Sequence, residues 1–332
     1  MFIDAHVHFW NKESCVENTW FFMEVKPEYY GWWAKNFRNV DVSEEKSTVA
    51  DYDPRRIEKA LRSYGVEKAV AFAMDIPGVQ YVTNDYIANG VKESKGFFVG
   101  IASVDPKKPK AEEELIYALS SLGLKGLKIF PIIQHFRPDD FVLTDRLYKI
   151  CIDYDVPVVI HLAAEPAEEG GILFTKTHSG ARSRLIYNQA IYIDEVSYRY
   201  PELKIVVAHA DYGLNISAAA MLCARRPNVY VDLARFGDRL QYAEEIEQIP
   251  PEKRDESLYL AYRAVGKEWV KRKFYDDLKH LLLYARPNRI IFGSDFPAIN
   301  PRWYKETISE VVEDKSVLKM IFEDNAKRIY KL

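Results

Sequence analysis

The sequence of 332 residues has few cysteines and no long apolar run. Cys15, Cys151 and Cys223 are odd in number, far apart and outside any CxxC pair. A disulfide framework is therefore not expected, and a reducing cytoplasm is the expected location. No stretch approaches the roughly 20 apolar residues that a membrane-spanning helix needs. The opening residues, MFIDAHVHFW, carry charge and histidine where a signal peptide has a basic start and an apolar run.

The chain also lacks an excess of either charge. It contains 46 Lys and Arg against 49 Asp and Glu, which gives a formal charge of −3. A nucleic-acid-binding protein or a polybasic membrane protein would show a basic excess. We therefore expect binding neither to nucleic acid nor to membranes, and a small molecule as the partner.

Short apolar runs rich in β-branched residues recur along the chain, with amphipathic helical segments between them. The runs are near-continuous rather than alternating, which is typical of strands covered on both faces. Eight such strands, each followed by helical sequence, favour a (β/α)8 TIM barrel. A doubly wound sheet is the rival fold, but no glycine-rich phosphate turn follows the first strand. The expected strands are Phe2–Phe9, Lys68–Met74, Phe97–Val104, Gly126–Pro131, Pro157–Leu162, Lys204–Ala210, Asn228–Ala234 and Arg289–Phe296.

The length of the chain leaves room for insertions in this barrel. A TIM barrel typically needs about 250 residues, so roughly 80 remain. We place them after strand 1, at Trp10–Tyr52, and after strand 7, at Arg235–Pro287. The first insertion is rich in aromatic residues, which suit either a roof over a planar substrate or a subunit interface in a homodimer. No linker or repeat divides the sequence, so residues 1–332 are expected to form one domain.

Residues with metal-binding and acid–base chemistry gather in the expected strands or at their ends. In a TIM barrel the functional residues lie at the C-terminal ends of the strands, where the loops form the open face. Five residues of the chain have that position or belong to strand 1. They are His6, His8, His161, His209 and Asp295.

The alternation of side chains along a strand predicts which of these residues point into the barrel. Asp4 shares a face with His6 and His8, and the apolar residues between them should pack on the helices. The same alternation points Lys128 of strand 4 inward, and in strand 6 it points Val207 inward together with His209.

A buried group of imidazoles, a carboxylate and an ammonium would be costly on its own. Each unpaired group would lose hydration at a cost of a few kcal/mol. A divalent metal resolves that cost, because imidazole nitrogens and a carboxylate oxygen are its natural ligands. Water at such a metal becomes acidic enough to act as a nucleophile near neutral pH.

These residues also carry a family resemblance. DxHxH at the start, the two later strand-end histidines and the strand-8 aspartate follow one another as in the amidohydrolase superfamily, which the sequence resembles. The segments GLKIFPIIQHFRPDD, PVVIHL, VVAHAD, IIFGSDFP and EDNAKRIYKL are similar to the amidohydrolase-2 branch. That branch includes metal-dependent hydrolases related to aminocarboxymuconate-semialdehyde decarboxylase and the resorcylate decarboxylases. The resemblance runs from residue 2 to the C-terminus, apart from the two insertions.

The resemblance implies a mononuclear metal site and a role for each residue. The expected ligands are His6, His8, His161 and Asp295. His209 is expected to hydrogen-bond the water at the metal and to act as general acid and base. Asp295 would be both ligand and proton shuttle. We expect one divalent ion per chain, zinc first and manganese as the alternative.

Lys128 leaves alternatives open. Binuclear members of the superfamily carry a carboxylated lysine at this strand, and His161 and His209 would then serve a second metal. The other interpretation is a plain ammonium paired with Asp4 or with a substrate carboxylate. A third is a site without metal, because some lactonases of this branch work without one.

Arginines at the expected open face suggest a carboxylated substrate, because guanidinium groups bind carboxylates in a fork. Arg182, Arg184, Arg235 and Arg302 all follow strand ends, and Arg235 is the closest to one. His178 lies in the loop of Arg182 and Arg184, where we expect a surface histidine, with contact to the substrate as the alternative. Asp211 and Asp232, at or beside strand ends, are expected to orient ligands.

Three functions fit this site. The first is a metal-dependent hydrolase that uses metal-activated water on an ester, lactone or amide of a small carboxylated substrate. The alternative is a lyase, either a non-oxidative decarboxylase of an aromatic or unsaturated carboxylate or a hydratase. The strand-4 region departs from that of the decarboxylases, which favours hydrolysis. A metal that only stabilises a binding scaffold is the third, but structural zinc sites are usually rich in cysteine.

Overall fold

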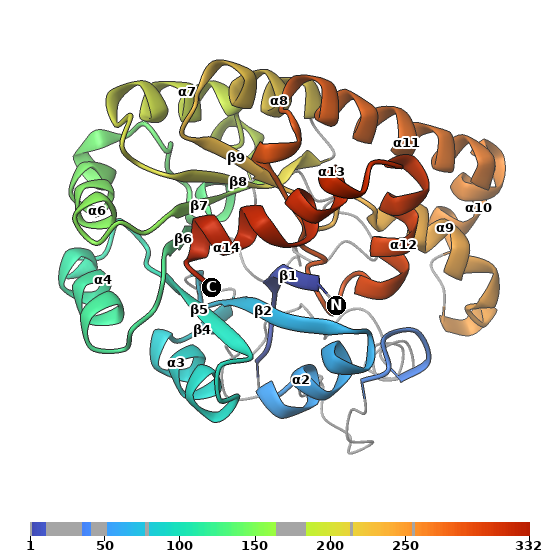
Figure 1. Cartoon of the computed structure of the whole chain (residues 1–332), viewed down its shortest axis with the longest axis horizontal. Helices are drawn as coiled ribbons and strands as arrows, with labels where there is room; N and C mark the ends of the chain where they lie inside the picture. The colour runs from blue at the N-terminus through green and yellow to red at the C-terminus, as the bar shows by residue number, and fades with distance from the viewer. Residues whose placement is uncertain are drawn as a thin grey trace.

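Eight parallel strands form the centre of the molecule, in an order along the sheet that follows the chain. The computed structural model describes residues 2–10, 35–40, 52–76, 80–163, 184–212, 215–253 and 256–332. Helices surround the strands (Figure 1). The (β/α)8 barrel predicted from the sequence is therefore confirmed, with a strand inside or overlapping each expected range. The strands are β1 (Phe2–Val7), β2 (Val66–Phe72), β5 (Phe98–Ser103), β6 (Leu127–Ile129), β7 (Val158–Ala163), β8 (Ile205–Tyr212), β9 (Val229–Asp232) and β10 (Ile290–Ile291).

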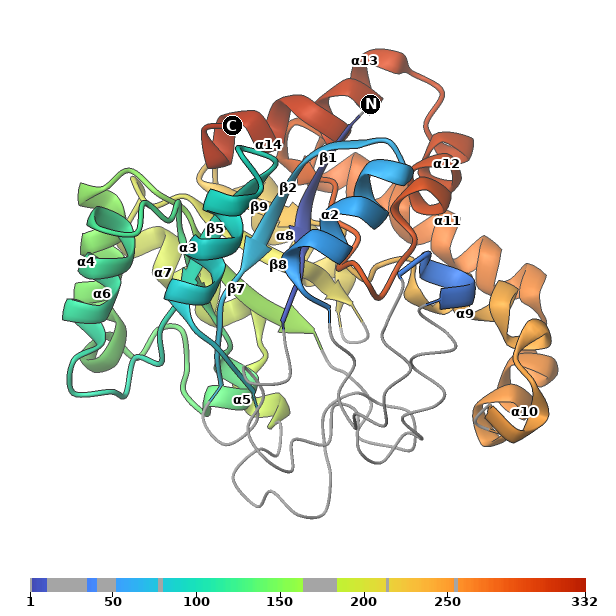
Figure 2. The same cartoon turned by 90° about the horizontal axis from the view of Figure 1, so that it is seen from below.

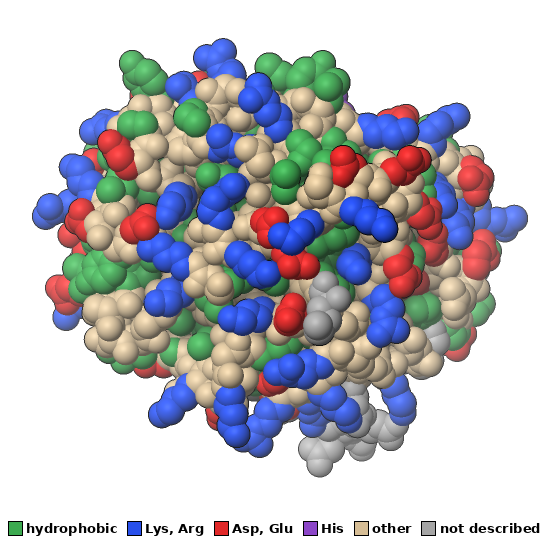
Figure 3. Space-filling view, viewed as in Figure 1, with side chains coloured by type: hydrophobic (Ala, Val, Ile, Leu, Met, Phe, Trp, Pro, Cys, Tyr) green, Lys and Arg blue, Asp and Glu red, His purple; other side chains and the backbone are tan. Residues whose placement is uncertain are grey.

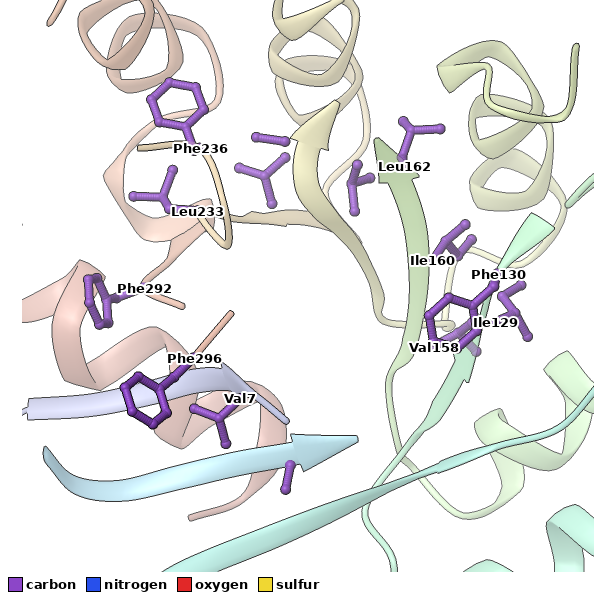
Figure 4. Close-up of a cluster of buried hydrophobic side chains, with 14 of the residues drawn as sticks. Val7, Ile129, Phe130, Val158, Ile160, Leu162, Leu233, Phe236, Phe292 and Phe296 are labelled. Atoms are coloured by element: carbon purple, nitrogen blue, oxygen red, sulfur yellow. The ribbon is translucent and has the colours of Figure 1, made fainter. Parts of the chain in front are cut away.

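The barrel closes between β1 and the segment that follows β10. The amide of Ala5 donates to the carbonyl of Phe292 at 3.0 Å, and the amide of His8 donates to that of Phe296 at 2.8 Å. Val7 and Phe296 form a parallel bridge and lie side by side in Figure 4. The first and last strands of the sequence thus meet, which brings DxHxH next to the segment containing Asp295.

The helices follow the strands as the amphipathic segments predict. Asp53 caps the first of them, accepting hydrogen bonds from the amides of Arg55 and Arg56 ahead of Pro54 at the first helical position. The sequence did not indicate a two-stranded hairpin of β3 (Met74–Ile76) and β4 (Gln80–Val82). The helices are α2 (Pro54–Ser63), α3 (Asn84–Glu93), α4 (Ala111–Ser120), α5 (Pro131–Gln134), α6 (Phe141–Asp153), α7 (Ala190–Arg199), α8 (Ile216–Arg225), α9 (Asp238–Glu245), α10 (Glu256–Val265), α11 (Lys267–Tyr284), α12 (Pro301–Val311), α13 (Lys315–Lys319) and α14 (Asn325–Tyr330).

The core has two layers, one between strands and helices and one inside the barrel. Val158, Ile160 and Leu162 of β7 point toward the surrounding helices (Figure 4). Their neighbour Val159 belongs to the inner cluster, which also contains Phe72 and residues of α14. α14 lies across the centre of the barrel in Figure 1, at the end opposite to α5 in Figure 2. One end of the barrel is therefore closed by α14, and the other end carries the loops that follow the strands.

The predicted side-chain direction is wrong for Asp4, because β1 contains an irregularity. Asp4 pairs with Ala69 and Val7 with Ala71, so β1 has one residue more than β2 between the two pairs. Before this bulge, Ile3 is part of the inner cluster, and Asp4 bonds instead to the amide and hydroxyl of Ser294 at 2.9 and 2.5 Å. The bulge resets the alternation, so that His6 still reaches the interior.

The prediction is also wrong for Val207, which packs in the outer layer, whereas Ala208 belongs to the inner cluster. His209 should then point outward with Val207. Its backbone, however, has a left-handed φ of 66°. The next two residues, Ala210 and Asp211, are also left-handed, with φ values of 48° and 56°. This departure from extended geometry breaks the alternation, and it leaves the His209 side chain in contact with His6 and His161.

The surface carries side chains of both charges. Lys and Arg side chains are scattered over the face seen in Figure 3, with Asp and Glu between them.

Most of the first insertion lies outside the described residues, so its predicted use as a roof or an interface stays a prediction. The second insertion holds α9, α10 and α11. Cys151 and Cys223 are buried free thiols, and Cys15 lies outside the described residues. Among the helices that the structure describes, none is both long and apolar enough to span a bilayer.

Candidate metal centre

The five residues that the sequence places at strand ends form one continuous cluster. The Oδ1 atom of Asp295 lies 3.0 Å from His8 Nε2 and 3.3 Å from His6 Nε2. The ring of His6 lies 5.0 Å from that of His209, which in turn lies 4.6 Å from that of His161. Residues separated by up to 289 positions in the chain are thus brought together at the end of the barrel that carries the loops.

Hydrogen bonds fix the tautomer of His6. Its Nδ1 lies 2.8 Å from Oδ2 of Asp232, whose other oxygen accepts hydrogen bonds from the amides of His209 and Ala234 at 2.8 and 3.1 Å. A carboxylate accepts the Nδ1 proton, so the Nε2 of a neutral His6 keeps its lone pair. Asp232 therefore orients His6 in the way that a carboxylate orients a metal-binding histidine, as the sequence predicted.

Hydrogen bonds also fix the tautomers of His209 and His161. The carbonyl of Ala234, which only accepts, lies 3.2 Å from His209 Nδ1, so this nitrogen carries the proton. The Nε2 of a neutral His209 then accepts from His161 Nδ1 at 3.0 Å. That leaves the lone pair of His161 Nε2 without a hydrogen-bond donor in the part of the chain that the structure describes.

The donor set fits a divalent metal. Two atoms bound to one zinc at roughly 2.0–2.2 Å lie about 3–3.6 Å apart, and the 3.0 and 3.3 Å separations of the His8 and His6 nitrogens from Asp295 Oδ1 match that range. His6 Nε2 and Asp295 Oδ1 are buried and lack a hydrogen-bond partner among the described residues. His6, His8 and Asp295 form one group whose ligand atoms lie within 4.8 Å of one another, and His6, His209 and Asp232 form a second. His161 stands outside both groups, next to His209.

Burial and neighbouring charges set the protonation of the cluster. Burial lowers the pKa of His6, His161 and His209, and the ammonium of Lys128 lowers each of them further. Burial alone would raise the pKa of Asp295, but the neighbouring histidines, His8 first, hold it well below its usual range. His6, His161 and His209 are therefore neutral imidazoles near an ionised Asp295, which is the state in which these groups bind a metal.

Lys128 lies inside the barrel, fully buried, as predicted. Its Nζ lies 5.0 Å from the ring centre of Phe72 and 5.3 Å from that of Phe130. Phe72 also packs on His6, with ring centres 4.3 Å apart. A cation between aromatic faces is a favourable arrangement.

Of the arginines proposed for substrate binding, the structure brings Arg235 to the cluster. Its Nε lies 4.0 Å from Asp295 Oδ2, and its Nη2 binds Asp238 at 2.8 Å. Arg302 instead donates to backbone carbonyls at the end of α2, and Arg184 packs over Tyr187. Neither contacts the cluster in the structure. Arg182 and His178 lie outside the described residues.

Three features of the site were not predicted from the sequence: the packing of Phe72, the close approach at Gly293 and a strained backbone. Phe72 packs against both His6 and His8, and its position at the end of an apolar strand was the only sign of it. Gly293 allows close approach, because a Cβ there would lie 2.7 Å from that of His6. Backbone strain also marks the site: Arg235 and Asp295 have φ values of 57° and 59°, in the left-handed region that non-glycine residues rarely adopt.

Solved structures share this fold at low sequence identity. A zinc-bound amidohydrolase from Burkholderia multivorans is 15% identical, with a TM-score of 0.62 and coverage of 100% of this chain and 99% of that one. A probable 2-pyrone-4,6-dicarboxylic acid hydrolase from Acinetobacter baumannii is 11% identical, with a TM-score of 0.59 and the same coverage. A 5-carboxyvanillate decarboxylase from Novosphingobium aromaticivorans, solved with manganese, is 16% identical, with a TM-score of 0.59 and coverage of 100% and 97%.

Similarity to these structures establishes the fold, and it extends to both hydrolases and decarboxylases. No curated protein sequence matches the chain. The amidohydrolase family profile, Amidohydro_2, matches residues 3–332, which includes every residue of the cluster. The chain therefore belongs to the amidohydrolase family.

Proposed function

We propose that this protein is a metal-dependent hydrolase that cleaves an ester, lactone or amide bond in a small carboxylated substrate. The observation that carries the proposal is the convergence of His6 Nε2, His8 Nε2 and Asp295 Oδ1, with Oδ1 within 3.3 Å of both nitrogens. His6, His8, His161 and Asp295 would hold one zinc ion per chain, with manganese as the alternative. The ion would polarise the scissile carbonyl and lower the pKa of water.

His209 is the proposed general acid and base. It is buried, neutral and within ring contact of His6 and His161. The carbonyl of Ala234 holds its Nδ1 proton, so the Nε2 is the atom that takes a proton. That nitrogen now accepts from His161, and a reorientation of His161 toward the ligand set would release it. Asp295, at the same site, would carry a proton onward as its second proposed role.

Two cations would recognise the substrate carboxylate. Arg235 lies beside Asp295, with Nε 4.0 Å from Asp295 Oδ2, and Asp238 orients its guanidinium through Nη2 at 2.8 Å. Lys128 lies deeper, between Phe72 and Phe130. The faces of two aromatic rings favour an ammonium over an anionic carboxylated lysine, so we propose a mononuclear site with an uncarboxylated Lys128.

Metal content tests the state of Lys128. We expect one zinc per chain by elemental analysis, the same value after purification in bicarbonate, and the same value in a Lys128→Met variant. Methionine keeps the length of the side chain and packs against aromatic rings. Two ions per chain that require bicarbonate and fall to one in Lys128→Met would instead show a carboxylated, bridging lysine.

A substrate panel tests the reaction. We expect that lactones and esters bearing a carboxylate release acid in a pH-stat assay, and that Arg235→Gln raises KM for them more than for uncharged esters. The solved structures of similar fold include decarboxylases, so the same panel should contain hydroxylated aromatic carboxylates with detection of carbon dioxide. Carbon dioxide release without hydrolysis would assign the chain to the lyases.

A further inference from the structure

The two insertions meet directly behind Asp295. Arg38 belongs to the described part of the first insertion, residues 35–40, and Glu245 is the last residue of α9 in the second. Both side chains are buried; Arg38 is only 2% exposed. A buried arginine needs acceptors for its donors, and the position of those acceptors indicates what it does.

The guanidinium of Arg38 joins a carboxylate to the turn that follows Asp295. Its Nη1 donates to Glu245 Oε1 at 2.6 Å, and its Nη2 to Oε2 at 3.3 Å. On the other side, Nε donates to the carbonyls of Pro297 at 2.9 Å and Ala298 at 3.0 Å, and Nη2 donates to that of Ala298 at 2.6 Å. Two nitrogens of one side chain, Nε and Nη2, thus hold two consecutive carbonyls of this turn through three hydrogen bonds.

The turn of residues 295–298 sets the position of the Asp295 carboxylate. The amide of Ala298 donates to the carbonyl of Asp295 at 2.8 Å, and the amide of Asp295 donates to that of His6 at 2.8 Å. Residues 295–298 are therefore held from β1 at one end and by Arg38 at the other. Asp295 also has a left-handed φ of 59°, a conformation that persists only where the surroundings impose it.

α9 supports the same contact from its far side. Gln241 donates to Glu245, and its Oε1 accepts from the amide of Asn300 at 2.9 Å. Asn300 in turn caps α12. Glu245 is thereby fixed in place to receive Arg38.

We propose that Arg38 is a positioning residue for the metal ligand Asp295, which it holds through the carbonyls of Pro297 and Ala298. The inference rests on the proposed function, because it assigns Asp295 to the metal. In this proposal Arg38 is not a metal ligand and acts only through the backbone of the turn. Its removal should release the turn, relax the strained backbone of Asp295 and move the carboxylate oxygen away from His6 and His8.

Zinc affinity is the readout. Metal-free protein is titrated with zinc in competition with a chromogenic chelator, for the wild type and for Arg38→Met, Arg38→Lys and Glu245→Gln. We expect about 10–100-fold weaker zinc binding in Arg38→Met, the range typical of outer-sphere partners. Arg38→Lys should lose less zinc affinity than Arg38→Met, because its ammonium keeps the ion pair with Glu245. Some loss should remain, because one ammonium cannot hold both carbonyls. Glu245→Gln, which removes only the charge, keeps the test valid if Arg38→Met does not fold.

A control separates positioning from general stability. Arg226→Met breaks a contact of similar chemistry, since Arg226 Nε, at the end of α8, lies 2.6 Å from Oδ1 of Asp194 in α7. It should lower the Tm and leave the zinc affinity unchanged. In the background of Asp295→Ala, Arg38→Met should cause no further loss of affinity, because two residues that act through one contact are not additive.

The outcomes for zinc binding separate the proposed function from the positioning role of Arg38. Wild-type protein that binds no zinc would overturn the proposed function. Tight zinc binding by the wild type and equally tight binding by folded Arg38→Met and Glu245→Gln would overturn the positioning role alone. An additive loss in the double variant with Asp295→Ala would also overturn it.

Discussion

Replacement of His209 by asparagine is expected to lower kcat by about 10²–10⁴-fold, the contribution typical of a general acid or base, while one zinc ion stays bound. Asparagine can still accept a hydrogen bond from His161 Nδ1, which lies 3.0 Å from the histidine nitrogen, but it cannot take up a proton near neutral pH. Turnover and zinc content of the same preparation are the two measurements.

The matched control is His280→Asn. His280 lies on α11, next to Tyr284, and α11 is one of the helices on the outside of the barrel (Figure 1). It should leave both values unchanged. Unchanged turnover in His209→Asn would remove this residue from the mechanism. Loss of zinc together with activity would make His209 a ligand, in the second group with His6 and Asp232.

Asp295→Ala is expected to abolish activity and to weaken zinc binding strongly, in contrast to His209→Asn. Asp295 Oδ1 is the atom that approaches both His8 and His6, so its loss removes a direct ligand. We expect zinc affinity to fall by more than about 100-fold, beyond the loss typical of outer-sphere partners. Zinc should raise the Tm of the wild type, because it binds the folded state, and should leave the Tm of the variant unchanged.

Asp155→Ala is the control for this variant. Asp155 pairs with Lys204 and Lys331 at the surface, and its removal should leave the zinc-induced rise in Tm intact. A zinc-induced rise of wild-type size in Asp295→Ala would contradict the assignment of Asp295 as a ligand.

The barrel could be predicted from the sequence because buried parallel strands have a simple signal. Each is covered on both faces, so it appears as a short continuous apolar run, and eight such runs are hard to arrange otherwise. The β3–β4 hairpin has only three residues in each strand, too few to show a period. The gathering of His161, His209 and Asp295 followed from the same barrel, since strand ends share one face.

Side-chain direction was the weakest part of the prediction, because it depends on backbone irregularities that the sequence does not reveal. The bulge in β1 follows Asp4, which bonds to Ser294, and it lets His6 face the interior. The left-handed backbone that begins at His209 in β8 breaks the alternation that would have pointed His209 outward with Val207. Both irregularities lie at the site. They carry functional side chains into the barrel that regular strands would have pointed elsewhere.

The support around the metal ligands was predicted only in part. Asp232 was recognisable because it lies at the end of a strand, and it binds His6 Nδ1 at 2.8 Å. Arg38 was not, because its contacts with Glu245 and Pro297 span 207 and 259 positions of the chain and no local pattern links them. The first insertion looked like an aromatic roof or interface, whereas its described part lies against the turn that carries Asp295.

The most direct test of the central claim is the anomalous scattering of zinc in a crystal of the zinc-loaded protein. One peak per chain is expected, within about 2.0–2.2 Å of His6 Nε2, His8 Nε2 and an oxygen of Asp295. A strong peak held by other residues, or no peak among these three in a crystal that contains zinc elsewhere, would contradict the account.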